Sequence, residues 1–146
     1  MRAVLAAALL LAAPAPAAAG DRAPVAYTVV DGAEIPEPIA GPGDPRRGAE
    51  IATDPERGGC LGCHALGGRV APDAAFGAPL DGVGARRSSG FLRLSVVNYA
   101  ILEPSVGGHA FYDVIERDAP DLEIGATRLT AQEIEDLVAW LSNLGA

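Results

Sequence analysis

Cys60-Leu61-Gly62-Cys63-His64 is the stretch of sequence that decides the fold, because it contains both cysteines of the chain and one of its two histidines. The spacing C-x-x-C-H is the attachment signature for c-type haem. Thiols at this spacing reach the two vinyl groups on one edge of a porphyrin, and the histidine that follows then lies beneath the iron as an axial ligand. We therefore predict one covalently attached haem c, bound through Cys60 and Cys63 and ligated by His64.

Three other interpretations of the motif fit its surroundings less well. A redox dithiol of the C-x-x-C type normally lies in a βαβ context, which the sequence does not indicate. A disulfide that closes a loop of two residues adds little stability. A zinc site that also used His109 would need the ligand spacing of a zinc finger, and the adjacent Cys63 and His64 do not match it.

Residues 1–19 are predicted to be a cleaved signal peptide. Met1 and Arg2 form a short positive start, an apolar run follows, and small residues precede a cleavage site after Ala19. The apolar run is too short for a hydrocarbon core of about 30 Å, which disfavours the alternative of a membrane anchor. We expect an exported, periplasmic protein whose mature chain has no membrane span.

The composition excludes one class of partner and points to an added apolar group. The formal net charge is −8, from 11 cationic and 19 acidic residues, and every cation is arginine. A protein this acidic does not bind nucleic acid through its overall field. Aromatic residues make up only 5% of the chain, so a covalent haem would supply apolar bulk that the core lacks.

The mature chain divides into an arm and one domain. Residues 20–43 contain four prolines and show no helical period, so they form either an extended arm on the domain or a disordered linker. Residues 44–146 form one all-α domain with long loops, since strand signals are weak throughout.

Capping signals place the first two helices of this domain. Asp44 followed by Pro45 is a helix start, and this helix is expected to end before Gly58. Either Ser88 or Ser89 caps the second helix, whose apolar residues follow at once.

The last helix has the clearest signal of all. Thr130 and Glu133 form a capping box, and apolar residues follow at helical spacing. The helix dipole favours the acidic side chains of its first two turns, Glu135 among them. Elsewhere, residues 65–90 are predicted to be mostly loop, and residues 111–116 one or two helical turns.

The sixth position of the iron has few candidate ligands in this chain. The only methionine, Met1, leaves with the signal peptide, and there is no lysine and no third cysteine. His109 remains, and the two glycines before it let the backbone approach a porphyrin face. We favour ligation by His64 and His109; the alternative is a surface His109 with a five-coordinate or water-bound iron. Two imidazoles should give a lower reduction potential than a histidine and a methionine.

Three loop residues have weaker functional interpretations. Pro79 would offer its carbonyl to the second ring nitrogen of His64 and so fix the ring, or it is an ordinary loop proline. Arg86 is a candidate partner for the haem propionates, because arginine is a forked donor. Arg87 is interpreted as a solvated loop residue.

Longer stretches around the motif, within residues 35–144, match a known family. They are Ile35-Pro36-Glu37-Pro38, Gly43-Asp44-Pro45, Arg47-Gly48, Asp81-Gly82-Val83-Gly84-Ala85-Arg86, Leu92-Arg93-Leu94-Ser95-Val96-Val97 and the capping-box helix from Leu129 to Leu141. In these stretches the chain resembles SoxX, the small monohaem cytochrome c subunit of SoxAX complexes in bacterial sulfur oxidation.

The resemblance implies a class I cytochrome c fold and a heterodimer with a SoxA-like cytochrome c subunit. Such complexes oxidatively couple thiosulfate to a cysteine of the carrier SoxYZ, with the sulfur chemistry at a haem-ligating cysteine of SoxA. This chain would then pass electrons to a downstream acceptor, and no catalysis is expected from it alone. The alternatives are an independent periplasmic electron carrier and, less favoured, a haem gas sensor.

One position departs from the family pattern. The family usually has a methionine ligand shortly before an aromatic pair. Here His109 stands before Phe111 and Tyr112. The departure brings into question both the usual potential and the usual electron acceptor.

Overall fold

The computed structural model describes residues 22–69, 77–105, 109–113 and 126–145. Within these ranges the chain forms five α-helices and one short 3-10 turn, with no β-sheet, and the expected all-α class is confirmed. The elements are α1 (Pro45–Thr53), η2 (Cys60–Gly62), α2 (Val83–Arg86), α3 (Ser89–Val97), α4 (Tyr99–Leu102) and α5 (Ala131–Asn143).

The three longer helices begin at the capping residues that the sequence indicates. The side chain of Asp44 accepts a backbone N–H of the first turn of α1 at 2.9 Å. The hydroxyl of Ser88 does the same for α3 at 3.1 Å. Thr130 and Glu133 form a reciprocal capping box at the start of α5.

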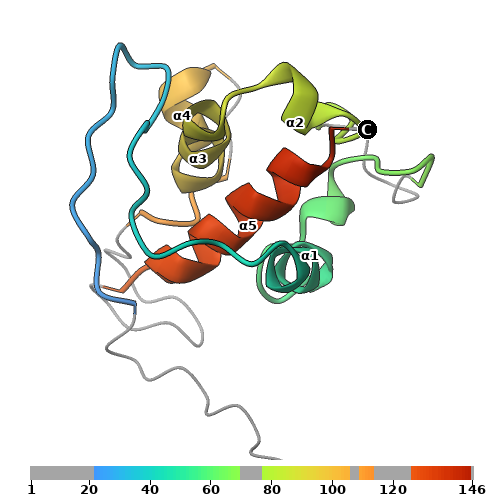
Figure 1. Ribbon diagram of the computed structural model, residues 1–146, viewed down its shortest axis with the longest axis horizontal. Coiled ribbons are helices and arrows are strands. Elements are labelled where there is room, and N and C mark those ends of the chain that lie inside the picture. The colour runs from blue at the N-terminus through green and yellow to red at the C-terminus, as the bar shows by residue number, and fades with distance from the viewer. Residues whose placement is uncertain (1–21, 70–76, 106–108, 114–125, 146) are drawn as a thin grey trace, which may run out of the picture.

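α1 and α5 pack against each other at the centre of the molecule (Figure 1). A glycine allows their close approach, because a Cβ atom on Gly48 would lie 2.1 Å from the carbonyl oxygen of Asp136. A larger residue at position 48 would have to push the helices apart, and close-packed interiors resist such a shift.

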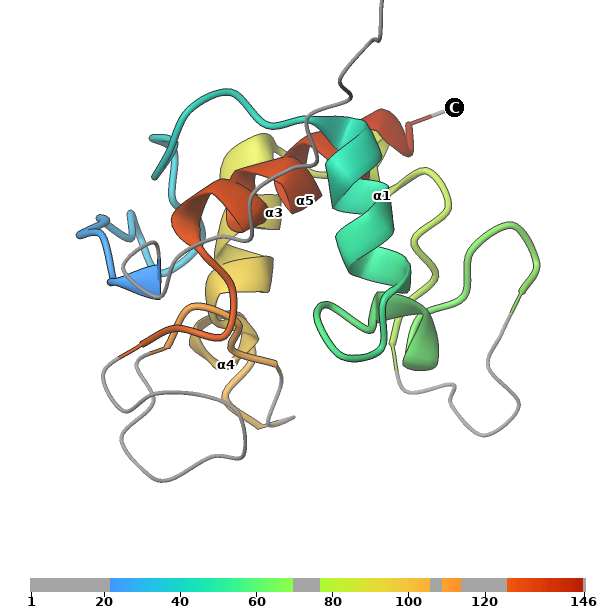
Figure 2. The ribbon, with the colours of Figure 1, turned by 90° about the horizontal axis from the view of Figure 1, so that it is seen from below.

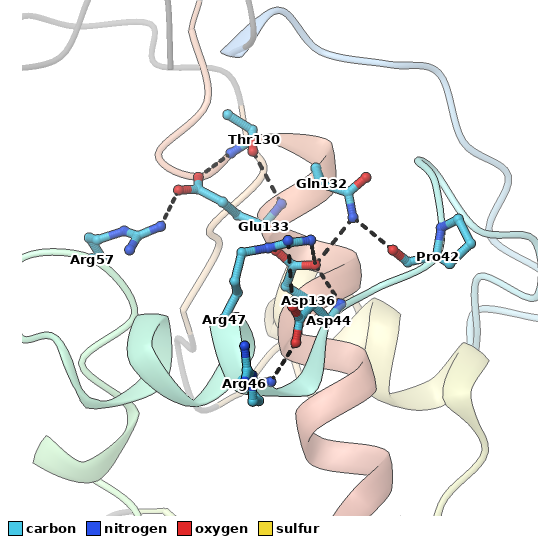
Figure 3. A network of polar contacts seen from close by, with 9 residues as sticks. All are labelled: Pro42, Asp44, Arg46, Arg47, Arg57, Thr130, Gln132, Glu133 and Asp136. Carbon is cyan, nitrogen blue, oxygen red and sulfur yellow. Dashed lines mark hydrogen bonds and ion pairs between the residues drawn. The ribbon is translucent and has the colours of Figure 1, made fainter. Parts of the chain in front are cut away.

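A polar network fastens the same two helices together (Figure 3). The carboxylate of Asp136, only 2% exposed, accepts N–H groups from Arg47 at 2.8 and 3.1 Å and the backbone N–H of Asp44 at 2.7 Å. One turn earlier on α5, Glu133 pairs with Arg57. The buried carboxylate of Asp136 is therefore fully supplied with donors.

The apolar core lies between α1, α3 and α5. Each of its central side chains contributes about 1.5–3 kcal/mol through burial. η2, α2 and α4, in contrast, contain no buried residue. The most deeply buried large aliphatic side chains of the three longer helices are Ile51, Leu94, Val97, Ile134 and Leu137, each 1% exposed or less.

Residues 22–43 form an extended arm that lies beside α3 and α5 (Figure 1). Ile35 and Ile39 of the arm are 1% and 8% exposed. The buried guanidinium of Arg93 donates to the Ile35 carbonyl at 2.7 Å and makes two bonds, of 2.7 and 2.9 Å, to the carboxylate of Glu135. Glu135 also accepts the N–H of Ile39 at 2.9 Å. Buried isoleucines and hydrogen bonds therefore attach residues 35–39 to α3 and α5.

The structure differs from the sequence-based expectation in the shortest elements. α2 lies inside the stretch that the sequence predicts to be loop, and α4 has no counterpart among the predicted helices. Residues 111–113 form a bend, so the helical turns predicted there are wrong, and residues 114–116 lie outside the described residues. Both unexpected helices are only four residues long, too short for an amphipathic pattern.

Among the described helices, none combines the length and the apolar character needed to cross a lipid bilayer. The segment predicted to be a signal peptide lies outside the described residues.

Candidate haem site

The C-x-x-C-H motif curls into a single tight turn directly after α1. Gly59 opens the turn with a φ of +55°, a conformation that favours glycine. The backbone N–H groups of Cys63 and His64 both donate to the carbonyl of Cys60, at 3.2 and 2.9 Å. The turn thus presents two thiols and one imidazole from five consecutive residues, with Cys60 half-buried and Cys63 exposed.

The environment of Cys60 argues against a redox dithiol. Burial disfavours the thiolate and raises the pKa of the Cys60 thiol to about 11. Reactive cysteines of C-x-x-C redox motifs have lowered pKa values, because the thiolate is the nucleophile. The part of the chain that the structure describes also gathers no group of three or more His, Cys, Asp or Glu side chains suited to a metal ion, so the four ligands of the zinc alternative do not converge.

A backbone carbonyl fixes the imidazole of His64, but it belongs to Ala78 and not to Pro79. Nδ1 of His64 lies 2.7 Å from the carbonyl oxygen of Ala78. Because a carbonyl only accepts, Nδ1 carries the proton and donates it, which leaves the Nε2 lone pair for a metal. The prediction for Pro79 is therefore off by one residue; the carbonyl of Pro79 instead accepts from Arg86 at 3.4 Å.

Gly77 is a site residue that the sequence analysis missed. A Cβ atom at this position would lie 2.4 Å from Nδ1 and 2.5 Å from Cε1 of His64. The N–H of Gly77 donates to the carbonyl of Cys63 at 3.1 Å, and that of Leu80 donates to Ala65 at 2.9 Å. The backbone at Gly77 therefore packs closely against the ring of His64. A glycine just before Ala-Pro is the only signal for this contact in the sequence, and it is a weak one.

Arg86 contacts the loop of residues 77–82, which also contains Ala78. Its guanidinium donates to the carbonyl of Asp81 at 2.6 Å in addition to the longer bond to Pro79. Asp81 in turn accepts the N–H of Gly67 at 2.8 Å through its side chain. Arg86 therefore stabilises the loop that supplies the carbonyl to His64.

His109 faces His64, although the two are far apart in the sequence. Their ring centroids are 6.2 Å apart and their planes are inclined by 53°. Two imidazole–metal bonds of about 2.0 Å in line across one ion place the ring centroids roughly 6 Å apart. The distance between the two rings is therefore compatible with one metal ion between them. Figure 2 shows the elements that precede them in the chain: η2, which is followed by His64, lies after α1 on one side, and α4 lies on the other.

The surroundings of His109 favour the neutral imidazole. Its ring centroid lies 5.7 Å from that of Tyr99 and 5.1 Å from that of Phe111, and its carbonyl accepts the N–H of Tyr99 at 3.0 Å. Desolvation of the charged form is the main cause that lowers the pKa of His109, and the neighbouring His64 adds to it. A neutral imidazole is the form that binds a metal.

An all-helical domain with two thiols on one turn and two opposed imidazoles is a haem-binding domain of the c type. The chain belongs to the cytochrome c family, whose model matches residues 45–145. As in that family generally, its role is electron transfer through haem c.

A more particular likeness is to a chain of the crystal structure of SoxXA from P. pantotrophus. The two share 31% sequence identity with a TM-score of 0.69, and the match covers 84% of this chain and 95% of that chain. The resemblance to SoxX and the class I cytochrome c fold are thereby confirmed. No curated protein sequence matches the chain.

Proposed function

We propose that this chain is an exported cytochrome c with one haem, the electron-transfer subunit of a SoxAX-like complex that oxidatively couples thiosulfate to a carrier-protein cysteine. The observation that carries the proposal is the short distance between the ring of His64, in the C-x-x-C-H motif, and the ring of His109. The chain that contains this pair is similar to a chain of SoxXA. Export follows from the signal peptide that we predict for residues 1–19.

In this proposal, Cys60 and Cys63 would hold the haem covalently, and His64 and His109 would ligate its iron. The haem supplies one-electron chemistry when bound. The Ala78 carbonyl keeps the proton on Nδ1 of His64, which would leave the lone pair of Nε2 free to bind the iron. Arg86 has five N–H groups and uses two in the loop, which leaves donors for a haem propionate.

The partner that we propose is a SoxA-like cytochrome c subunit, with the carrier SoxYZ and a downstream electron acceptor as further members of the pathway. The similar solved chain comes from SoxXA. Both cysteines of this chain belong to the haem motif, so no thiol remains for sulfur chemistry. The thiol-dependent steps would therefore take place on the partner and the carrier, and this chain would accept electrons.

The test is a pull-down of the tagged, haem-loaded chain from host cells grown on thiosulfate, with haem counted per complex. We expect a tight one-to-one complex with a second cytochrome c, present at lower yield in cells grown without thiosulfate. Recovery of the chain alone with one haem would favour the independent electron carrier. Recovery without covalent haem would overturn the haem assignment itself.

A further inference from the structure

Asn98 lies at the junction of α3 and α4 and makes two side-chain contacts there. Its Oδ1 accepts the N–H of Ala100 at 3.0 Å and so caps α4. Its Nδ2 donates to the carboxylate of Asp113 at 2.9 Å. One side chain thus joins the start of α4 to the end of the described segment 109–113.

The segment 109–113 carries His109 and has no regular structure of its own. Backbone bonds hold it along the same junction: Tyr99 N–H donates to the His109 carbonyl at 3.0 Å, and Phe111 N–H donates to the Val96 carbonyl at 3.3 Å. Tyr112 N–H adds a bond of 3.2 Å to the carbonyl of Val97. The position of the His109 ring therefore depends on how firmly this segment lies on the junction.

From this geometry we propose that Asn98 is a positioning residue for His109. The side chains of Asn98 and Asp113 form a clamp, which closes the far end of the segment 109–113 and keeps His109 on the iron. The inference rests on the proposed ligation of the iron by His109. Opening the clamp should increase the fraction of time that His109 spends off the iron.

Carbon monoxide binding to the ferrous holoprotein measures that fraction. The gas binds only while the sixth position is open, so its rate of binding follows the population of the open state. Asp113→Ala removes the clamp and leaves the α4 cap intact, whereas Asn98→Ala removes both. We expect both variants to bind carbon monoxide roughly three- to tenfold faster than the parent, in line with the loss of one exposed hydrogen bond.

Two further variants make the result decisive. Asn143→Ala, a substitution of an exposed asparagine at the end of α5, should leave the rate unchanged. His109→Ala should bind the gas fastest of all. An Asp113→Ala protein that binds at the parent rate would overturn the clamp while leaving ligation by His109 intact. A His109→Ala protein that binds at the parent rate would overturn both. Asp113 is exposed, so its variant carries the test even where Asn98→Ala folds poorly.

Discussion

Two regions of this molecule are held together by different means. The frame, which we define as residues 22–43 with α1, α3 and α5, contains the apolar core, the buried pair of Arg93 and Glu135 and the buried carboxylate of Asp136. We define the site side as η2, α2 and α4 with residues 63–69, 77–82 and 109–113. It contains only two buried side chains of the core, Leu80 and Tyr112. Most of the site side is held in place by backbone hydrogen bonds and by hydrogen bonds from side chains to nearby backbone groups.

The two regions should therefore respond differently to substitution. Side-chain burial stabilises the frame, so changes there should lower the free energy of unfolding and leave the properties of the haem unchanged. The site side positions two imidazoles, so changes there should alter the reduction potential and the spectrum at a smaller cost in stability.

The largest expected effect on stability comes from Glu135→Gln in the frame. The substitution leaves the buried guanidinium of Arg93 without its counter-charge, and breaking a buried ion pair costs about 3–5 kcal/mol. Urea denaturation of the holoprotein measures the loss, and the haem spectrum should match that of the parent. Glu37→Gln, at an exposed position of the arm, is the matched control and should stay within about 0.5 kcal/mol. A loss under about 1 kcal/mol for Glu135→Gln would show that the pair does not hold the arm.

The second expected effect is on the site side. His109→Met replaces a strongly donating imidazole by a thioether, so we expect the reduction potential to rise by roughly 0.1–0.2 V, a fraction of the about 0.8 V over which axial ligands act. Spectroelectrochemical titration measures the potential. Ser105→Ala, at an exposed position of the loop after α4, should leave it unchanged. An unchanged potential in His109→Met would mean that residue 109 does not reach the iron.

The third effect concerns the contact between Gly77 and the ring of His64. The added Cβ of Gly77→Ala must displace the ring from the Ala78 carbonyl, at a cost of about 1–3 kcal/mol. Without that acceptor the imidazole donates less to iron, so the potential should rise as well. Gly62→Ala is the matched control within the motif, because a Cβ there has no neighbour within 4 Å. Equal potentials for the two variants would show that the Ala78 carbonyl does not tune the iron.

The sequence indicates correctly those features that depend on neighbouring residues. Helices α1, α3 and α5 follow from Asp44, Ser88 and the capping box at Thr130, because a cap acts on backbone groups two or three residues away. The turn that presents Cys60, Cys63 and His64 is likewise local. For these features, residue type and spacing alone determine the geometry.

Features that depend on distant segments are harder to predict. The helix dipole accounts for an acidic Glu135 near the start of α5, but not for its burial against Arg93, since that pairing joins residues far apart in the chain. The acceptor for His64 is predicted one residue too late: the carbonyl of Ala78 lies at Nδ1, whereas that of Pro79 accepts from Arg86. The contact of Gly77 with His64 also arises only when two loops meet. Whether His109 ligates the iron and whether Arg86 binds a propionate stay predictions.

The smallest expected effect is the pH dependence of the free energy of unfolding, which we assign to Asp136 in the frame. Burial by itself raises the pKa of Asp136, but hydrogen bonds from Arg47, the Asp44 backbone and Gln132 outweigh it and hold the pKa below the ordinary value of 3.8. The folded state therefore binds a proton at the carboxylate of Asp136 less readily than the unfolded state does. The resulting stability is complete above about pH 4 and is lost as the pH falls through the lowered pKa.

Denaturation of the holoprotein at a series of pH values tests this sign. Asp136→Asn should cost about 1–2 kcal/mol at pH 7, because it removes charge-assisted hydrogen bonds, and its stability should then fall less steeply than that of the parent below about pH 4. Asp31→Asn is the control, since asparagine accepts the φ of +52° at this exposed turn, and its slope should follow the parent. If Asp136→Asn and the parent fell with the same slope, another carboxylate would account for the acid sensitivity. The junction of α1 and α5 would then owe its stability to the close contact at Gly48 more than to the charge on Asp136.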